Sequence, residues 1–448
     1  MFRHPGLFVF ALAFLIRIAY SIFIQQIYPE SIYQYDSWGY LNLAKNMFDS
    51  QVFSQMITEP FTPDSSRTPA YPGFIYLFHL FKLGGEWIVY IQALIGALTA
   101  FVTFRIAEII KRNNPANILA GLLVALDLPS IFMGNLVATE TLFTLFLVIS
   151  IYFAVKGVRF KEERNVTISI IILALATLIR PITLYYTLLI PTLYFLFSGL
   201  SIIRRIKTLV LHIILIAIFI GPWIYRNHSV FEAPFYSSIS EVNLLFHTST
   251  QIRSFAENRP QKPIEMEYRN DSLGHLDFVN NASAMKPFIL FARSETRRVI
   301  KKHPMVFLKM WGTSCVMFFV KPMRSYFNMQ LKGENSYSAI SSVEERGKGD
   351  LLSKTLDKSD NLTLVLVAFQ IIMLALIYLG ILFSLRHWLT KDFTIFFLLL
   401  SLVGYFAIIS SLTEVDARLR LPVLPILAVL SVHCFNSLFN KFAGHTDE

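Results

Sequence analysis

Six charged residues are of types that are costly to place at a membrane boundary, and all six are expected on one side of the membrane once the apolar segments are threaded. They are Asp36, Arg67, Glu140, Arg180, Arg226 and Arg420. A carboxylate can take a proton from a reacting group, and the planar fork of a guanidinium matches phosphate oxygens two at a time. The set therefore predicts a polar pocket with two carboxylates and several guanidinium groups at the mouth of a helical bundle.

The elements that must position these residues are membrane helices. Hydrophobic residues make up 54% of the chain, aromatic residues 15% and charged residues only 16%, with a mean hydropathy of +0.53. This composition is typical of an integral membrane protein. Apolar runs, most of them near the ~20 residues that span a bilayer, cover residues 7–27, 87–110, 116–133, 137–155, 166–179, 182–199, 208–225, 361–385, 392–412 and 421–440. We expect an all-α polytopic protein with about ten transmembrane helices in a single membrane domain, residues 1–448.

Short basic connections fix the expected orientation. They include Lys111-Arg112, Arg204-Arg205 and the loop from Arg386 to Lys391. Because such connections favour the cytoplasm, both termini are expected there. The formal charge of +10 is then mainly a topology signal, and no nucleic-acid partner is expected.

Two outer regions follow from that orientation. Residues 28–86 form the first extracytoplasmic loop, with interfacial helices expected near 37–49 and 70–82. Residues 226–360 form an extracytoplasmic cap region, in which the polar stretch 226–304 predicts a small irregular cap that is too small for an independent domain. Within the cap, residues 305–320 are apolar enough to insert, but a full crossing would put the basic loop at Arg386 outside. We therefore expect an interfacial or re-entrant helix there.

Metal and disulfide chemistry have little support in the sequence. Cys315 and Cys434 fall on opposite ends of the expected topology, so a disulfide is not expected. The ten histidines show no HExxH or comparable ligand spacing. We expect no cofactor and no protein-held metal cluster, with a divalent ion left open.

Six different short motifs along the chain are expected on the same side of the membrane. They are YDSWGY at 35–40, RTPAYP at 67–72, TETLF at 139–143, LIRP at 178–181, PWIYRN at 222–227 and RLRLPVLP at 418–425. Their order resembles the GT-C membrane glycosyltransferases, in particular the protein O-mannosyltransferases and lipid A aminoarabinose transferases. One departure is that Ser37 stands where that family usually has the second carboxylate of an acidic pair.

The resemblance implies that one sugar moves, with inversion, from a polyprenyl-phosphate donor to an acceptor at the extracytoplasmic face. The acceptor would be a lipid-linked glycan, a lipid or a protein. Asp36 is the predicted general base, although it also suits the N-cap of the helix that follows. Glu140 is the second catalytic candidate, or a structural ion-pair partner of Arg17, Arg67 or Arg180, because an unpaired charge there would be costly.

The arginines favour a phosphate ligand, because fixed positive groups stabilise the charge that develops on a leaving phosphate. Arg418 and Arg420 precede an apolar span, where they would hold the phosphate while the isoprenoid tail lies against the bundle. The other predicted substrate-binding residues are Arg67, Tyr71, Arg180 and Arg226. Snorkelling to the interface is an alternative role for Arg418 and Arg226. The sequence has no nucleotide-binding fingerprint, which also favours a lipid-linked donor.

Two other functions stay open at this level. A lipid or sugar transporter or flippase also buries charges among many helices, but it usually places them near the bilayer midplane. An oligosaccharide polymerase or ligase is a nearer relative. A bacterial inner membrane with the site facing the periplasm or exterior is the favoured location, which suggests cell-envelope glycans such as lipopolysaccharide.

Overall fold

The computed structural model describes residues 4–33, 35–272, 281–332, 361–413 and 416–432. Every regular element in these ranges is helical, which confirms the prediction of an all-α protein. Cys434, most of the outer stretch 321–360 and the last part of the run 421–440 lie outside the described residues.

Six of the described helices are long and apolar enough to cross a membrane. They are α1 (Pro5–Ile27), α4 (Gly85–Ile110), α7 (Glu140–Phe160), α10 (Ile202–Phe231), α19 (Asn361–Lys391) and α20 (Phe393–Ser410). A seventh candidate span is the pair α5 (Asn117–Ala125) and α6 (Leu128–Gly134), which bends by 50° between its halves. The protein is therefore a multi-pass membrane protein.

The remaining predicted spans coincide with shorter helices. The run 166–179 is α8 (Glu163–Ile179), and the run 182–199 is a 3-10 turn at Pro181–Thr183 followed by α9 (Tyr186–Phe197). The run 421–440 begins with the 3-10 segment η6 (Ala417–Val423) and continues as α21 (Leu424–Ser431). By length and composition, six or seven of the described helices qualify as spans. The helices α8 and α9 are shorter, with 17 and 12 residues, and the end of the run that begins with α21 lies outside the described residues.

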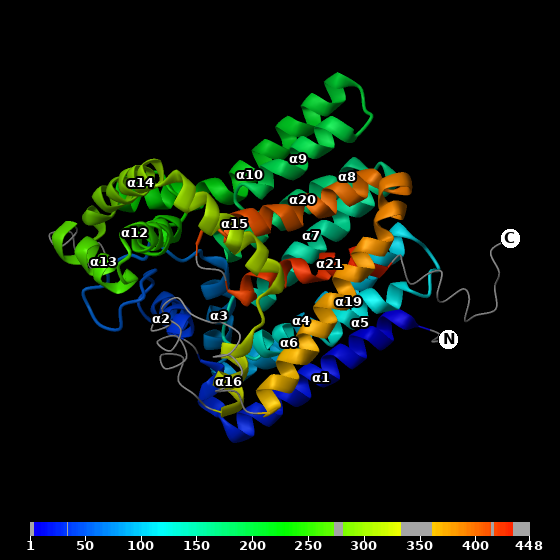
Figure 1. Ribbon diagram of the computed structural model, residues 1–448, viewed down its shortest axis with the longest axis horizontal. Helices are drawn as coiled ribbons and strands as arrows, with labels where there is room; N and C mark the ends of the chain where they lie inside the picture. The colour runs from blue at the N-terminus through cyan, green and yellow to red at the C-terminus, as the bar shows by residue number, and fades with distance from the viewer. Residues whose placement is uncertain (1–3, 34, 273–280, 333–360, 414–415, 433–448) are drawn as a thin grey trace.

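The core of the bundle forms around α4, which packs against α1, α5 and α7, while α8 covers the other side of α7. The helices α19 and α21 also approach closely: a Cβ added at Gly380 would lie 2.8 Å from the backbone oxygen of Ser431. Small residues permit this kind of approach in membrane bundles. The pair α9 and α10 projects away from the rest of the bundle (Figure 1).

Smaller helices gather at one end of the bundle, opposite to the start of α1 (Figure 1). The first loop contributes the 3-10 turn Pro29–Ile32, α2 (Tyr35–Asp49) and α3 (Ala70–Leu80). The cap contributes α11 (Ile239–Asn243), α12 (Thr250–Glu257), α13 (Gln261–Glu267) and α14 (Met285–Lys302), with π-helical turns at Leu244–Ser249 and Tyr268–Ser272 and a 3-10 turn at Ala282–Ala284. The expected positions of the two interfacial helices in the first loop agree with α2 and α3.

The segment at 305–320 forms α15 (Pro304–Val320), which is followed by α16 (Arg324–Lys332). The Cys315 thiol of α15 lies 3.8 Å from the carbonyl oxygen of Ala407, near the end of α20. In α16, Gln330 accepts a hydrogen bond from Tyr20, in the last third of α1. The described chain thus enters α15 from the cap and returns in α16 toward the end of α1 that lies on the same side. This path is compatible with the predicted re-entrant helix, whose depth in a membrane stays a prediction.

Candidate active site

The first predicted residue, Asp36, lies in the first turn of α2 and forms an ion pair with Arg67. Arg67 Nη2 is 2.9 Å from Asp36 Oδ1. The loop that carries Arg67 is fixed by Asp64, whose Oδ1 accepts the backbone N–H of Arg67 at 2.7 Å. The Arg67 guanidinium also lies over the ring of Tyr40, 4.8 Å from its centroid, a favourable cation–π arrangement. Two segments of the first loop are thereby joined at the carboxylate.

A third group reaches the same carboxylate from the far end of the sequence. Arg418 Nη1, in η6, lies 3.6 Å from Asp36 Oδ2. The start of η6 is capped by Asp416, whose Oδ1 accepts the backbone N–H of Arg418 at 2.9 Å. The other oxygen of Asp416 accepts a hydrogen bond from Tyr326 of α16 at 3.2 Å. Asp36 therefore lies between two guanidinium groups that are about 350 residues apart in the chain.

The charge balance keeps Asp36 ionised. Burial alone would raise the pKa of its carboxyl, but the Arg67 and Arg418 guanidinium groups outweigh that effect and hold the pKa below its ordinary value of 3.8. The Asp36 side chain retains 35% exposure. The carboxylate is thus ionised at neutral pH and partly exposed, and it has more lone pairs than its two partners use.

The second predicted carboxylate, Glu140, is paired with Arg180. Arg180 Nη1 lies 2.5 Å from Glu140 Oε1. Glu140 is the first residue of α7, where the helix dipole favours a negative charge, and Arg180 follows the last residue of α8. The Glu140 side chain is only 5% exposed, so its partner is necessary. Of the three arginines that the sequence offers as ion-pair partners of Glu140, Arg180 forms the contact in the structure.

Arg418 also connects the two ion pairs, because it interacts electrostatically with both Asp36 and Glu140. Its Nε and that of Arg67 are buried and have no hydrogen-bond partner among the described residues. Buried polar atoms in proteins nearly always have a partner. Each is therefore a donor whose acceptor the described residues do not supply.

Two other predicted residues, Tyr71 and Arg226, lie beside the ion-pair cluster. Tyr71 is fully buried, donates a hydrogen bond to Gln92 Oε1 at 2.9 Å and meets the ring of Tyr40 edge-on. Tyr71 thus packs against the ring of Tyr40, over which the Arg67 guanidinium lies. Arg226 donates to the backbone oxygen of Asp64 at 2.7 Å. It thus supports the loop behind Arg67 and lies outside the ion-pair cluster.

Arg420 binds backbone rather than side chains. Its guanidinium donates to the carbonyl oxygens of Phe318, Phe319 and Lys321 at 2.9, 2.8 and 3.1 Å. These carbonyls lie at the C-terminal end of α15, where a helix has no internal donors for them. Arg420 is 3% exposed. The predicted phosphate contact of Arg420 stays untested, and within the pair Arg418 is better placed for it.

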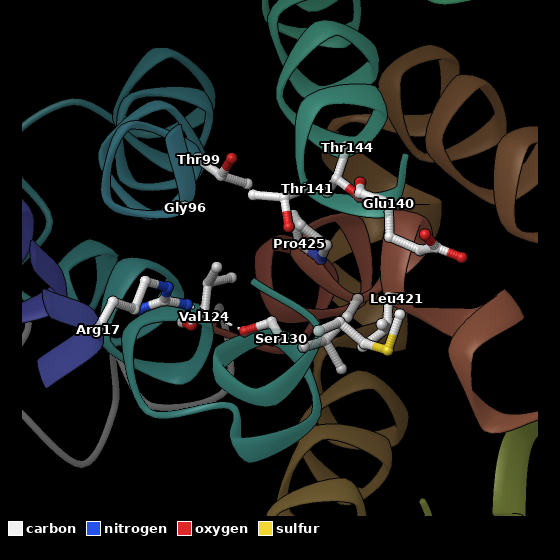
Figure 2. Close-up of a pocket in the computed structure, with 12 residues that line it drawn as sticks. Arg17, Gly96, Thr99, Val124, Ser130, Glu140, Thr141, Thr144, Leu421 and Pro425 are labelled. Carbon is white, nitrogen blue, oxygen red and sulfur yellow. Dashed lines mark hydrogen bonds between the residues drawn. The ribbon is translucent and has the colours of Figure 1, made fainter. Parts of the chain in front are cut away.

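A small cavity of about 30 Å³ lies behind Glu140. Figure 2 shows Arg17 on one side of it and Glu140 on the other, with Thr99, Thr141 and Thr144 between them. It has room for about one or two water molecules, so it does not accommodate a sugar. Arg17 donates to backbone oxygens of Val124 and Ala125 at the bend after α5, which is a structural role.

Sequence reasoning missed three polar residues of the site: Asp64, Asp416 and Tyr326. The two aspartates carry a local signal, since each lies two or three positions before a site arginine and caps its backbone N–H. Tyr326 has no comparable signal. Within the described residues no group of three or more histidine, cysteine, aspartate or glutamate side chains is arranged to hold a metal ion, and the divalent ion left open from the sequence stays untested.

Comparisons with known proteins agree with this architecture. A family model described as dolichyl-phosphate-mannose-protein mannosyltransferase matches residues 66–225, a range that contains Arg67, Glu140 and Arg180. No curated protein matches the sequence.

Solved structures of an archaeal oligosaccharyltransferase from Archaeoglobus fulgidus are similar in fold. The structure of AglB in complex with an inhibitory peptide and a dolichol-phosphate has a TM-score of 0.54 and 14% identity, over 98% of this chain and 51% of that chain. The apo form has a TM-score of 0.52 and 16% identity, over 100% and 53%. The chain thus spans about half the length of these enzymes. Together the family match and the shared fold confirm the resemblance to GT-C membrane glycosyltransferases.

Proposed function

We propose that the protein transfers one sugar from a polyprenyl-phosphate carrier to a hydroxyl-bearing acceptor at the extracytoplasmic face of the membrane. The observation that carries the proposal is the ionised Asp36 carboxylate, which lies 2.9 Å from Arg67 and 3.6 Å from Arg418 at one end of the bundle. The site thus combines a base with donors for a phosphate, and a transfer from a lipid phosphate needs both.

In the proposed reaction the acceptor oxygen attacks the anomeric carbon, and its proton passes to Asp36. The bond between the anomeric carbon and the phosphate oxygen breaks on the opposite face, which inverts the configuration. The polyprenyl phosphate leaves with the bonding electrons. The partly exposed guanidinium groups of Arg418 and Arg67 would stabilise the charge on that oxygen.

Asp36 is favoured over Glu140 as the base because of access. Glu140 is 5% exposed and has its closest contact with Arg180, whereas Asp36 is 35% exposed. We assign Glu140 and Arg180 to holding the ends of α7 and α8 together beside the reacting groups. The acceptor is a lipid-linked glycan, a lipid or a protein, and the sugar is a hexose or pentose.

A transporter or flippase is less well supported. Its polar groups would line a path near the bilayer midplane, whereas the ion pairs described here lie at one end of the bundle. An oligosaccharide polymerase or ligase would differ from the proposal in using a diphosphate-linked donor. A bacterial inner membrane, with the site on the periplasmic side, is the proposed location.

The test of the base is Asp36→Asn in proteoliposomes, with Asp49→Asn at the other end of α2 as the matched control. Loss of a well-placed base typically costs ~10²–10⁴ in rate, so Asp36→Asn should lose at least ~10² in turnover while binding of a labelled donor persists. The control should remain near the wild-type rate. Near-normal turnover of Asp36→Asn would move the base elsewhere, first to Glu140.

A further inference from the structure

A cluster of basic residues lies where α14 meets α15, outside the ion-pair site. We call it the basic corner, and it consists of Arg297, Lys301, Lys302 and Lys309. All four side chains are exposed. Arg297 and Lys301 are four residues apart and therefore share one face of α14. The corner concentrates four positive charges within 13 residues of the chain.

The acidic groups nearby are already used by other residues. Glu295 is the one carboxylate within α14; it pairs with Arg298 at 2.6 Å and accepts a hydrogen bond from Tyr268 at 2.9 Å. Glu241 pairs with Arg293, also at 2.6 Å. Within the described part of the chain, the four residues of the basic corner have no acidic partner. Among the described residues their charge is therefore left for an external anion.

An apolar face begins directly beside the basic corner. Met305, Leu308, Val316 and Val320 on α15 are 74%, 50%, 61% and 50% exposed. Their spacing of three, eight and four residues is close to whole helical turns and places them on one side of the helix. In a multi-pass membrane protein a face of this kind contacts lipid. The basic corner therefore lies at the boundary between lipid tails and water.

We propose that the basic corner binds the phosphate of an anionic phospholipid headgroup in the leaflet on the site's side of the membrane. A cluster of four to eight Lys and Arg residues beside a membrane helix attracts anionic lipid headgroups. Lys309 lies one to two turns into α15, and its long stem allows the ammonium group to reach back to the headgroup level. The four cations supply the charge, and the apolar face beside them contacts the acyl chains.

This lipid site is joined to the candidate active site through α15. The carbonyls at the other end of α15 are held by Arg420, two residues from Arg418. A headgroup bound at the basic corner thus fixes the end of a helix whose opposite end contacts η6. The proposal itself concerns lipid binding and does not depend on the reaction proposed above.

The test is lipid retention by purified protein from mixed nanodiscs of phosphatidylglycerol and phosphatidylcholine, measured by native mass spectrometry. Wild-type protein should retain phosphatidylglycerol selectively. The variant Arg297→Gln/Lys301→Gln/Lys302→Gln/Lys309→Gln should lose that selectivity at least in part. A charge-matched control at the other end of the bundle is Lys111→Gln/Arg112→Gln/Lys161→Gln/Lys391→Gln, and it should keep the lipid bound at the corner.

Three outcomes would overturn the proposal. Equal retention of the two lipids by the wild type would show that headgroup charge is not recognised. An equal loss in the corner variant and the control would show only a general effect of net charge. If inorganic phosphate alone raises the unfolding temperature of wild type as much as phosphatidylglycerol does, the corner is a site for a free anion. Because the readout is binding, these outcomes are independent of whether the enzyme transfers a sugar.

Discussion

The pair Glu140–Arg180 allows a quantitative prediction. Replacing Arg180 by Met removes the partner of a carboxylate that is 5% exposed and 2.5 Å away. Breaking a buried ion pair in this way costs about 3–5 kcal/mol. The Arg180 side chain is 20% exposed, so water can partly replace it, and we expect the lower end, about 3 kcal/mol. The double variant Glu140→Gln/Arg180→Met should recover most of this loss, because it leaves no unpaired charge.

The assay is thermal unfolding in detergent, followed by tryptophan fluorescence. Unfolding entropy near ~2.1 cal/mol/K per residue gives roughly 1 °C for each kcal/mol in a chain of 448 residues. Arg180→Met should therefore lower the unfolding temperature by about 3 °C, and the double variant by clearly less. The single variant Glu140→Gln completes the cycle. If the effects of Arg180→Met and Glu140→Gln simply add in the double variant, the pair does not interact in the way its geometry indicates.

Three further predictions concern the other groups of the site. The Arg67 and Arg418 groups hold the pKa of Asp36 below 3.8, so the stabilising contribution of the Asp36 carboxylate is present above that value and is lost as the pH falls through the lowered pKa. Arg67→Met should raise the pKa of Asp36 and shift the acid limb of the pH–rate profile to higher pH. An unchanged acid limb would contradict this prediction. Arg420→Ala should lower the unfolding temperature and turnover together, because each hydrogen bond from a charged group contributes about 1.5–3 kcal/mol. Arg418→Ala should lower turnover more than stability. The reverse pattern would return the phosphate contact to Arg420. In a Cys315→Ser/Cys434→Ser background, a cysteine at Lys301 should react with an impermeant reagent from outside and one at Lys391 only after permeabilisation; labelling of both from the same side would be incompatible with a re-entrant α15.

The sequence predicted which residues converge better than it predicted what each one contacts. Span counting and charge alone predict Asp36, Arg67 and Arg418 on one side of the membrane, and in the structure both guanidinium groups lie within 3.6 Å of the Asp36 carboxylate. Sidedness is accessible because each span reverses direction, and the basic loops fix the starting side. The same reasoning placed Glu140 beside a small set of possible partners.

The separate roles of Arg418 and Arg420 were not accessible from sequence. The two residues are two positions apart, and which of them faces the Asp36 carboxylate depends on the type of helix that carries them. That helix is a 3-10 segment, so its periodicity differs from that of an α-helix. The 17-residue length of α15 also fits a short span or a re-entrant helix, and only contacts between distant segments, such as Tyr20 with Gln330, describe its path.

Donor use in a reconstituted system tests the central proposal most directly. Purified protein in proteoliposomes should be given the same sugar on a polyprenyl phosphate, on a polyprenyl diphosphate and on a nucleotide, with Asp36→Asn as the inactive reference. The account predicts transfer from the polyprenyl-phosphate sugar, with release of polyprenyl phosphate, and no transfer above the reference from the other two. Efficient transfer from the nucleotide sugar, with no lipid intermediate formed, would contradict it.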